Sequence, residues 1–313
     1  MTHFLSFTWN FNDGINLGFY ILHFYSLMFV IAFGLGWYIM KKIYDREGES
    51  VAKLDTLFIY TIFATMLGAR LGHVFFYDWH YYKDHLSEII LPFKFSPEFE
   101  FTGFTGLASH GAAIAVIGTV VWYSKKIIHR PVLWMLDRVV LPVASGGIFV
   151  RIGNFFNSEI LGSETSPEVD TAVRFVRDTD NISPSAAMKI TQTTDPDTAY
   201  NLIANDPQYA DVLNGIPFRH PAQLYEAFGY IFVFLILFYM YWKTDSRKHH
   251  GLIFGVFLVL LWSVRFVVEF VKQSQGGFEG KQPLLLTGQW LSIPFILVGL
   301  YFVFTAKKRA ETL

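Results

Sequence analysis

Hydrophobic residues are gathered along this chain in long, nearly uncharged runs that are separated by polar segments. A window of about 19 residues, roughly the length of helix that crosses a bilayer, picks out about seven such runs. We expect each run to form a membrane-spanning α-helix. The runs cover roughly residues 19–40, 54–76, 104–124, 132–156, 222–242, 251–271 and 287–305.

A polar stretch, residues 157–220, separates the fourth run from the fifth and is too long for a simple turn. It is rich in Asp, Thr, Ser and Pro, and we interpret it as a small inserted domain. Weak periodicity over residues 180–210 indicates that part of it is helical. The sequence therefore predicts an all-α polytopic membrane protein. Residues 1–313 are expected to form a single transmembrane domain, with 157–220 as its insertion.

Composition agrees with a membrane protein. Charged residues make up 16% of the chain, whereas soluble domains carry roughly 25%. The net charge of −1 argues neither for nor against an anionic partner, and the expected surroundings are a lipid bilayer and not a nucleic acid. The chain contains no cysteine, which excludes disulfides, thiolate metal sites and a thiol nucleophile of its own. Residues 1–19 contain no Lys or Arg, so we expect the first apolar run to be retained rather than cleaved as a signal peptide.

Basic residues alternate between the loops, and this alternation predicts the orientation of the chain. Lys and Arg are enriched in cytoplasmic loops of membrane proteins. We therefore expect the N-terminus and residues 157–220 to face outward and the C-terminus to be cytoplasmic. The residues on which this rests are Lys41, Lys42, Arg46, Lys53, Lys125, Lys126, Arg130, Lys243, Arg247, Lys248, Lys307, Lys308 and Arg309.

Several polar residues fall at one depth of the predicted bundle. A helix rises about 1.5 Å per residue, which places Arg70, Arg151 and Arg265 about 20–28 Å up a hydrocarbon core about 30 Å thick. The same rise leaves Tyr25 and His110 about 9 Å below the outer surface. Ionisable groups at membrane depth are costly and usually functional. We therefore expect one shared polar layer in the outer half of the membrane.

Two polar motifs contribute most to this layer. Residues 151–162 read R-I-G-N-F-F-N-S-E-I-L-G and follow directly on the fourth apolar run. Arg151 and Asn154 are three residues apart, so they share a helical face, and Gly153 permits close approach of a helix or ligand. The second motif, H-P-A-Q-L-Y-E, lies at the outer mouth of the fifth run and contains His220, Gln223, Tyr225 and Glu226.

Arginines grouped at one depth suit a phosphate. A guanidinium binds phosphate oxygens bidentately and keeps its charge, so it can hold a lipid headgroup or stabilise a phosphate leaving group. A histidine at the same level is a plausible proton acceptor near neutral pH. The residues alone thus predict a lipid-phosphate site with acid–base capacity, and they do not name the reaction.

Each of these residues also has a structural interpretation. Arg138 lies near the cytoplasmic end of its run and is compatible with a side chain that snorkels to the interface. Arg265 and Glu269 are four residues apart and are compatible with an internal ion pair. His110 is compatible with a hydrogen-bonded core histidine, and Tyr25 with an interfacial aromatic residue.

The motif at 151–162 closely resembles the signature of bacterial prolipoprotein diacylglyceryl transferases, usually written G-R-x-G-N-F-x-N-x-E-x-x-G. Val150 stands where that signature has its first glycine, which removes no polar group. Other segments of the family are present in the same order over nearly the whole chain except 163–215. They are F-Y-S-L-M at Tyr25, G-A-R-L-G-H at Arg70, H-G at His110, H-P-A-Q-L-Y-E at His220, R-F-V-V-E-F at Arg265 and G-Q-W-L-S-I-P at Gln289.

The resemblance implies an activity and a set of roles. Members of that family move the diacylglyceryl group of phosphatidylglycerol to the lipobox cysteine of a preprolipoprotein signal peptide in the bacterial inner membrane. The resemblance implies that Arg151 and Arg265 hold or activate the phosphate and that His110 is a candidate base. Glu159 and Glu269 are either alternative bases or carboxylates that fix an arginine. No metal or cofactor is expected. The remaining motif residues are expected to bind substrate: Tyr25, Arg70, Asn154, Asn157, Glu159, Gly162, His220, Gln223, Tyr225, Glu226 and Glu269.

Other classes of protein fit the sequence less well. A transporter would place its polar residues near the midplane and often shows an inverted repeat, but no repeat is visible here and the polar layer is off-centre. A lipid-binding scaffold would explain the arginines and leave His110 and the H-P-A-Q-L-Y-E motif without a role. A metal-dependent membrane hydrolase is disfavoured, because no H-E-x-x-H or comparable ligand spacing occurs.

Overall fold

The computed structural model describes residues 6–12, 14–18, 21–89, 91, 93–94, 99–101, 106–273 and 284–310. In this part of the chain, seven helices are long and apolar enough to cross a membrane, which confirms the predicted all-α polytopic fold. The helices that supply these spans are α1 (Phe24–Glu47), α2 (Val51–Phe76), α4 (Ser109–Tyr123, continued by the π-helix η2, Ser124–Ile128), α5 (Val132–Phe156), α9 (Ala222–Lys243), α10 (Leu252–Val268, continued by the 3-10 helix η5, Glu269–Val271) and α11 (Thr287–Ala310).

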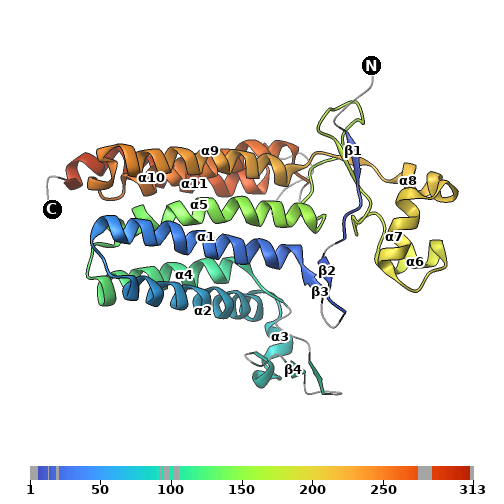
Figure 1. The fold of residues 1–313 in the computed structure, drawn as a ribbon, viewed down its shortest axis with the longest axis horizontal. Helices are drawn as coiled ribbons and strands as arrows, with labels where there is room; N and C mark the ends of the chain where they lie inside the picture. The colour runs from blue at the N-terminus through green and yellow to red at the C-terminus, as the bar shows by residue number, and fades with distance from the viewer. Residues whose placement is uncertain are drawn as a thin grey trace. The chain divides into compact units, whose positions relative to one another are not determined.

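The chain divides into two compact units, residues 1–36 with 140–313 and residues 37–139. The first unit holds the N-terminal half of α1, the C-terminal half of α5, and α9, α10 and α11. In it α10 packs against both α9 and α11, as Figure 1 shows. Gly255 and Gly299 lie opposite each other in this packing: a Cβ on either glycine would come within 2.8 Å of the other's carbonyl oxygen. Small residues let these two helices approach closely.

The second unit is built around the packing of α2 against α4. Gly68 and Gly72 lie one helical turn apart on α2 and face Gly111 in the first turn of α4. A Cβ on Gly111 would meet the Gly68 carbonyl oxygen at 2.1 Å and the Gly72 Cα at 2.6 Å. This contact between backbones explains the glycines of the G-A-R-L-G segment as packing residues. The same unit contains the short helices α3 (Trp79–Tyr82) and η1 (Leu86–Ile89) and a two-stranded ladder of β4 (Phe93–Lys94) and β5 (Glu100–Phe101).

Residues 21–23, directly before α1, form a strand, and this corrects the expected start of the first helix near residue 19. β1 (Phe7–Trp9) pairs in parallel with β6 (Val173–Phe175), and β6 pairs antiparallel with β7 (Phe218–Arg219). β2 (Gly14–Asn16) and β3 (Ile21–His23) form an antiparallel pair that leads directly into α1. Ile21 and Leu22 of β3 extend the apolar run of α1, so the hydrophobic pattern does not separate the strand from the helix. In β1, the Trp9 ring packs on that of Phe155, with 4.6 Å between the ring centroids.

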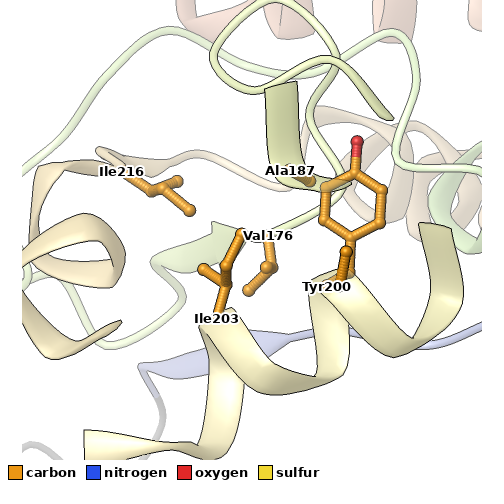
Figure 2. Packing of buried hydrophobic residues seen from close by; sticks show 6 residues of the cluster. Val176, Ala187, Tyr200, Ile203 and Ile216 are labelled. Atoms are coloured by element: carbon orange, nitrogen blue, oxygen red, sulfur yellow. The ribbon is translucent and has the colours of Figure 1, made fainter. Parts of the chain in front are cut away.

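The segment 157–220 is partly helical, as predicted. Its helices are α6 (Pro184–Thr191), α7 (Pro196–Asn205), η3 (Pro207–Tyr209) and α8 (Ala210–Gly215). Ser183 and Asp195 cap α6 and α7 through their side chains, each followed by proline at the first helical position, as is common at helix starts. A buried apolar cluster holds these elements together (Figure 2). Its members are Val176, Ala187, Ala199, Tyr200, Ile203 and Ile216.

Arg138 does not snorkel to an interface. Its side chain is 2% exposed and forms an ion pair with Glu47 at 2.9 Å. The guanidinium also lies over the Trp134 ring, 4.1 Å from its centroid, and Nη1 donates to the Trp134 carbonyl. The snorkelling interpretation is wrong because the partner of Arg138, Glu47, lies at the end of α1, far away in sequence. The residues around Arg138 in the sequence do not indicate this contact.

Candidate active site

Arg151 is the centre of a polar cluster in the first unit. It lies one and a half turns before the end of α5, its side chain is 12% exposed, and its Nε forms an ion pair with the buried carboxylate of Glu226 on α9. Nη1 donates to Asn154 Oδ1 at 3.1 Å. The predicted shared face of Arg151 and Asn154 is thus observed, and Glu226 from the second motif joins it. The guanidinium is held in one orientation by partners on two helices.

Residues 157–162, the part of the R-I-G-N-F-F-N-S-E-I-L-G motif that follows α5, form a loop (the signature loop) that continues this network. Asn157 and Asn154 donate to the Glu159 carboxylate at 2.9 and 3.5 Å. Gln223 Nε2 on α9 donates to the Glu159 backbone carbonyl at 2.7 Å. Positive φ angles at Ser158 and Ile160, 52° and 59°, give the loop the sharp path that these contacts require. Backbone strain of this kind is common at functional sites.

Two tyrosines lie against Arg151 and Asn154. The Tyr25 ring at the start of α1 packs on Gly153, where a Cβ would come within 2.8 Å of the ring, and its hydroxyl forms a hydrogen bond with Asn154. Arg151 donates a hydrogen bond to the Tyr230 hydroxyl on α9. Sequence reasoning did not select Tyr230. The available signal was its position four residues after Glu226, on the same face of the helix.

Gly162 has a packing role that only glycine can fill. A Cβ at this position would lie 2.3 Å from the His220 carbonyl oxygen and 2.7 Å from that of Val271. The loop, the start of α9 and the end of η5 therefore meet at one point. This close approach connects the two sequence motifs with the Arg265 segment.

Arg265 and Glu269 do not pair with each other as the structural alternative suggested. Glu269 pairs with Lys272, with 3.8 Å between Oε2 and Nζ, and its carboxylate packs against Gly288 in the first turn of α11. Arg265 lies over the Trp262 ring at 5.1 Å. In the part of the chain that the structure describes, Arg265 has no carboxylate within ion-pair distance. Its charge is thus available to an anion.

Lys272, just after η5, also belongs to this cluster and was not selected from the sequence. Its side chain is 8% exposed. Burial lowers the pKa of the Lys272 ammonium group, and the carboxylates of Glu226 and Glu269 counteract this only in part. Because Lys272 follows the last apolar residue of a span, it resembled an ordinary boundary lysine in the sequence.

His220 and Tyr225 face a different neighbour from Gln223 and Glu226. The Tyr225 hydroxyl is hydrogen-bonded to Thr171 in the segment between α5 and α9, and His220 Nδ1 lies 3.4 Å from the same hydroxyl. The H-P-A-Q-L-Y-E motif therefore has two functions in the fold. Gln223 and Glu226 hold the signature loop and Arg151, while His220 and Tyr225 contact the polar segment.

A cavity of about 330 Å³ opens beside the signature loop. Carboxylates and hydroxyls dominate its lining, so it suits a polar occupant. Ser158 Oγ is buried there without a hydrogen-bond partner among the described residues. The lining residues are Ser158, Glu159, Ile160, Leu161, Asp178, Thr179, Asp180 and Gln273.

Arg70 and His110 belong to the second unit, on two helices in direct contact. Arg70 is buried, and its guanidinium donates to the carbonyls of Ile89 and Glu88 at 2.9 and 2.7 Å, so it holds the segment that follows α2. His110 is exposed in the first turn of α4. Their predicted roles in substrate binding and proton transfer stay predictions.

Known proteins resemble this chain over almost its full length. A model of the family described as prolipoprotein diacylglyceryl transferase matches residues 14–305. A phosphatidylglycerol–prolipoprotein diacylglyceryl transferase of Chloroherpeton thalassium is 34% identical, over 96% of this chain and 93% of the relative. Proteins of the same name from Bacteroides fragilis and Tolumonas auensis are each 33% identical, over 97% and 95% of this chain and 97% and 96% of the relatives.

The chain belongs to the prolipoprotein diacylglyceryl transferase family. This confirms the resemblance drawn from the separate motifs and the expectation of a membrane-embedded transferase. Residues of three motifs of this family meet in the first unit, at Arg151, Glu226 and the Glu269–Lys272 pair.

Proposed function

We propose that this chain transfers the diacylglyceryl group of phosphatidylglycerol to the lipobox cysteine thiol of a preprolipoprotein. A sulfur–carbon bond forms, the carbon–oxygen bond to the phosphate breaks, and glycerol phosphate leaves with the electron pair. The names of the relatives support this reaction. The absence of cysteine from the chain fits it, because the substrate supplies the nucleophile.

The observation that supports the proposal most directly is that one cluster contains two arginines with different partners. Arg151 is fixed by Glu226 and Asn154, whereas Arg265 has no carboxylate within ion-pair distance among the described residues. A fixed guanidinium beside an available one provides a preorganised site for a phosphodiester and for the charge that develops as it leaves. Asn154, Asn157, Glu159 and Gln223 keep the loop in place around it.

An assay with three components tests the reaction. Purified protein is mixed with labelled phosphatidylglycerol and a lipobox peptide, and mass spectrometry detects the diacylglyceryl adduct on the peptide. The expected result is an adduct that requires the cysteine and is lost with a serine peptide. Phosphatidylethanolamine in place of phosphatidylglycerol serves as the headgroup control. Absence of the adduct with folded wild-type protein would overturn the proposed reaction.

His110 is the proposed base for the thiol. A thiol with pKa about 8.5 is mostly protonated at neutral pH, so a group must accept its proton or stabilise the thiolate. His110→Gln keeps a polar side chain but cannot accept the proton, so the rate at pH 7 should fall by about 10²–10⁴-fold. Raising the pH should rescue part of the rate, because solvent then supplies thiolate. A variant that is equally slow at every pH would assign His110 to substrate positioning, with Glu159 or Glu269 as the next candidates for the base.

The proposed membrane orientation has the N-terminus and residues 157–220 outside and the C-terminus in the cytoplasm of a bacterial cell. It rests on the basic loops. Cysteines introduced singly at Ser185, in α6, and at Thr312, beyond the described residues, should label oppositely with an impermeant maleimide on intact cells. Labelling of Thr312→Cys with protection of Ser185→Cys would reverse the orientation and place the site in the other leaflet.

A further inference from the structure

Lys272 is a largely buried cation that lies outside the sequence motifs and has no role in the reaction proposed above. Its Nζ lies 3.8 Å from Glu269 Oε2, and only 8% of its side chain is exposed. Lysine is rarely buried to this extent unless it is paired or functional. A contact of 3.8 Å with one carboxylate is long for a charge-assisted hydrogen bond, so this pair alone does not satisfy the ammonium group.

The backbone holds Lys272 against the signature loop. Gln273 N donates to the Leu161 carbonyl at 3.1 Å, and Ser163 N donates to that of Val271 at 2.8 Å. Gly162 and Lys272 form an antiparallel bridge between these two hydrogen bonds. The position of Lys272 is therefore set by the same loop that carries Asn157 and Glu159.

The charges around Lys272 leave a place for an anion. It interacts electrostatically with Glu226, Glu269, Arg265 and Arg151, which come from α9, η5, α10 and α5. Glu226 is already bound by Arg151, and Glu269 is the one carboxylate within ion-pair distance of Lys272 among the described residues. Arg265 has no carboxylate within ion-pair distance among the described residues, and Lys272 has one only at 3.8 Å. Such an arrangement favours an anionic occupant.

We propose that Lys272 is a third phosphate-binding residue, which stabilises the glycerol phosphate as it leaves; this rests on the transfer reaction proposed above. The phosphodiester of phosphatidylglycerol carries one negative charge. When the carbon–oxygen bond breaks, the electron pair remains on the phosphate oxygen, and the departing phosphate gains a second negative charge. An ammonium group close to that oxygen stabilises the transition state more than it stabilises the complex with intact phosphatidylglycerol.

Substitution of Lys272 tests this role by its effect on kcat. Lys272→Met keeps the length of the side chain and removes the charge, so kcat should fall by about 10- to 100-fold, the usual worth of a hydrogen bond to a charged group. The KM for phosphatidylglycerol should change little. Lys248→Met is the matched control: Lys248 pairs with Asp245 at the same spacing of three residues, but it is 61% exposed, and its loss should leave kcat unchanged.

The pH dependence separates a phosphate contact from a structural ion pair. The pKa of Lys272 is lowered by burial, so the ammonium is present below that pKa and is lost as the pH rises through it. Arginine stays charged throughout. The rate of the wild type relative to Lys272→Arg should therefore decline as the pH rises. Taking this ratio cancels the contribution of thiol ionisation, which is common to both proteins.

Two results would overturn the inference. One is a Lys272→Met variant whose kcat equals that of Lys248→Met. The other is a rate ratio of wild type to Lys272→Arg that does not vary with pH, a measurement that holds even if Lys272→Met fails to fold. Both require adduct formation by the wild type. Failure of the wild type to form the adduct would instead overturn the proposed reaction, so the two failures are distinguishable.

Discussion

Helix α5 carries two arginines with little exposed side chain, Arg138 and Arg151, and the groups that surround them differ. Arg138 has a carboxylate, an aromatic ring and a backbone carbonyl as partners, and its side chain is 2% exposed. Arg151 also has a carboxylate and an amide partner, but Arg265 and Lys272 add two further positive charges to its surroundings. Arg138 is bound on several sides by its own partners, whereas the surroundings of Arg151 include Arg265, which has no carboxylate within ion-pair distance among the described residues.

Burial and an ion pair are common to both arginines, so these two features alone do not distinguish them. A buried pair with well-placed hydrogen bonds is consistent with a purely structural role. What marks the Arg151 cluster is the nearby Arg265, which has no carboxylate within ion-pair distance among the described residues, next to a loop with positive φ angles at Ser158 and Ile160. Substitution of one arginine at a time, with stability and turnover measured separately, tests this difference.

Removing Arg138 should give the largest effect, and it should be an effect on stability. Arg138→Met removes one partner of a largely buried ion pair with Glu47, a change that typically costs about 3–5 kcal/mol. Thermal unfolding in detergent should show a strongly lowered Tm, with normal turnover per folded molecule. Adding Glu47→Leu should restore part of the stability, because both partners of the ion pair are then replaced by apolar residues. A normal Tm with lost turnover would make Arg138 part of the active site.

Arg151→Lys should give the opposite pattern, a loss of activity with a smaller loss of stability. Lysine can still pair with Glu226 but cannot hold Asn154, Tyr230 and a phosphate oxygen at once. The cost of one such donor in a preorganised site is about 2.7–4 kcal/mol, or on the order of a hundred- to a thousandfold in rate. Arg265→Lys should behave similarly. Near-wild-type turnover in both variants would show that neither arginine holds the reacting phosphate.

Much of the fold was predictable because a membrane span leaves a strong signal in sequence. Long apolar runs located the spans, although α1 continues to Glu47, beyond the predicted end near residue 40. The charged residues Lys41, Lys42 and Asp45 end the apolar run but not the helix. The strands β1, β2 and β3 are each three residues long. Strands this short carry no periodic signal, and β1 finds its partner β6 more than 160 residues away.

The site was predictable where polar residues stand out against an apolar run. Arg151, Asn154 and Glu226 were selected for this reason, and the structure brings them together. Tyr230 was missed because a tyrosine within an aromatic-rich helix looks like its neighbours. Lys272 was missed because lysine at the end of a span is ordinary. Their roles depend on contacts between α9, α10 and the signature loop, which one sequence does not reveal.

Tyr230→Phe should give the smallest effect. It measures how much the Tyr230 hydroxyl contributes to holding the Arg151 side chain in place. The substitution removes the hydroxyl that accepts a hydrogen bond from Arg151 and keeps the ring that packs in the buried interface. A hydrogen bond to a charged group contributes about 1.5–3 kcal/mol. Tyr230 acts on the phosphate only through Arg151, so we expect part of this energy to appear in kcat, as a fall of up to about tenfold. The matched control is Tyr44→Phe in the second unit, where the buried hydroxyl is hydrogen-bonded to that of Tyr123 at 2.9 Å. The control should lose a similar amount of stability and no turnover per folded molecule. Equal turnover in the two variants would mean that Glu226 and Asn154 orient Arg151 without help from Tyr230. The nearby Arg265, rather than a denser hydrogen-bond network, would then be what separates Arg151 from Arg138.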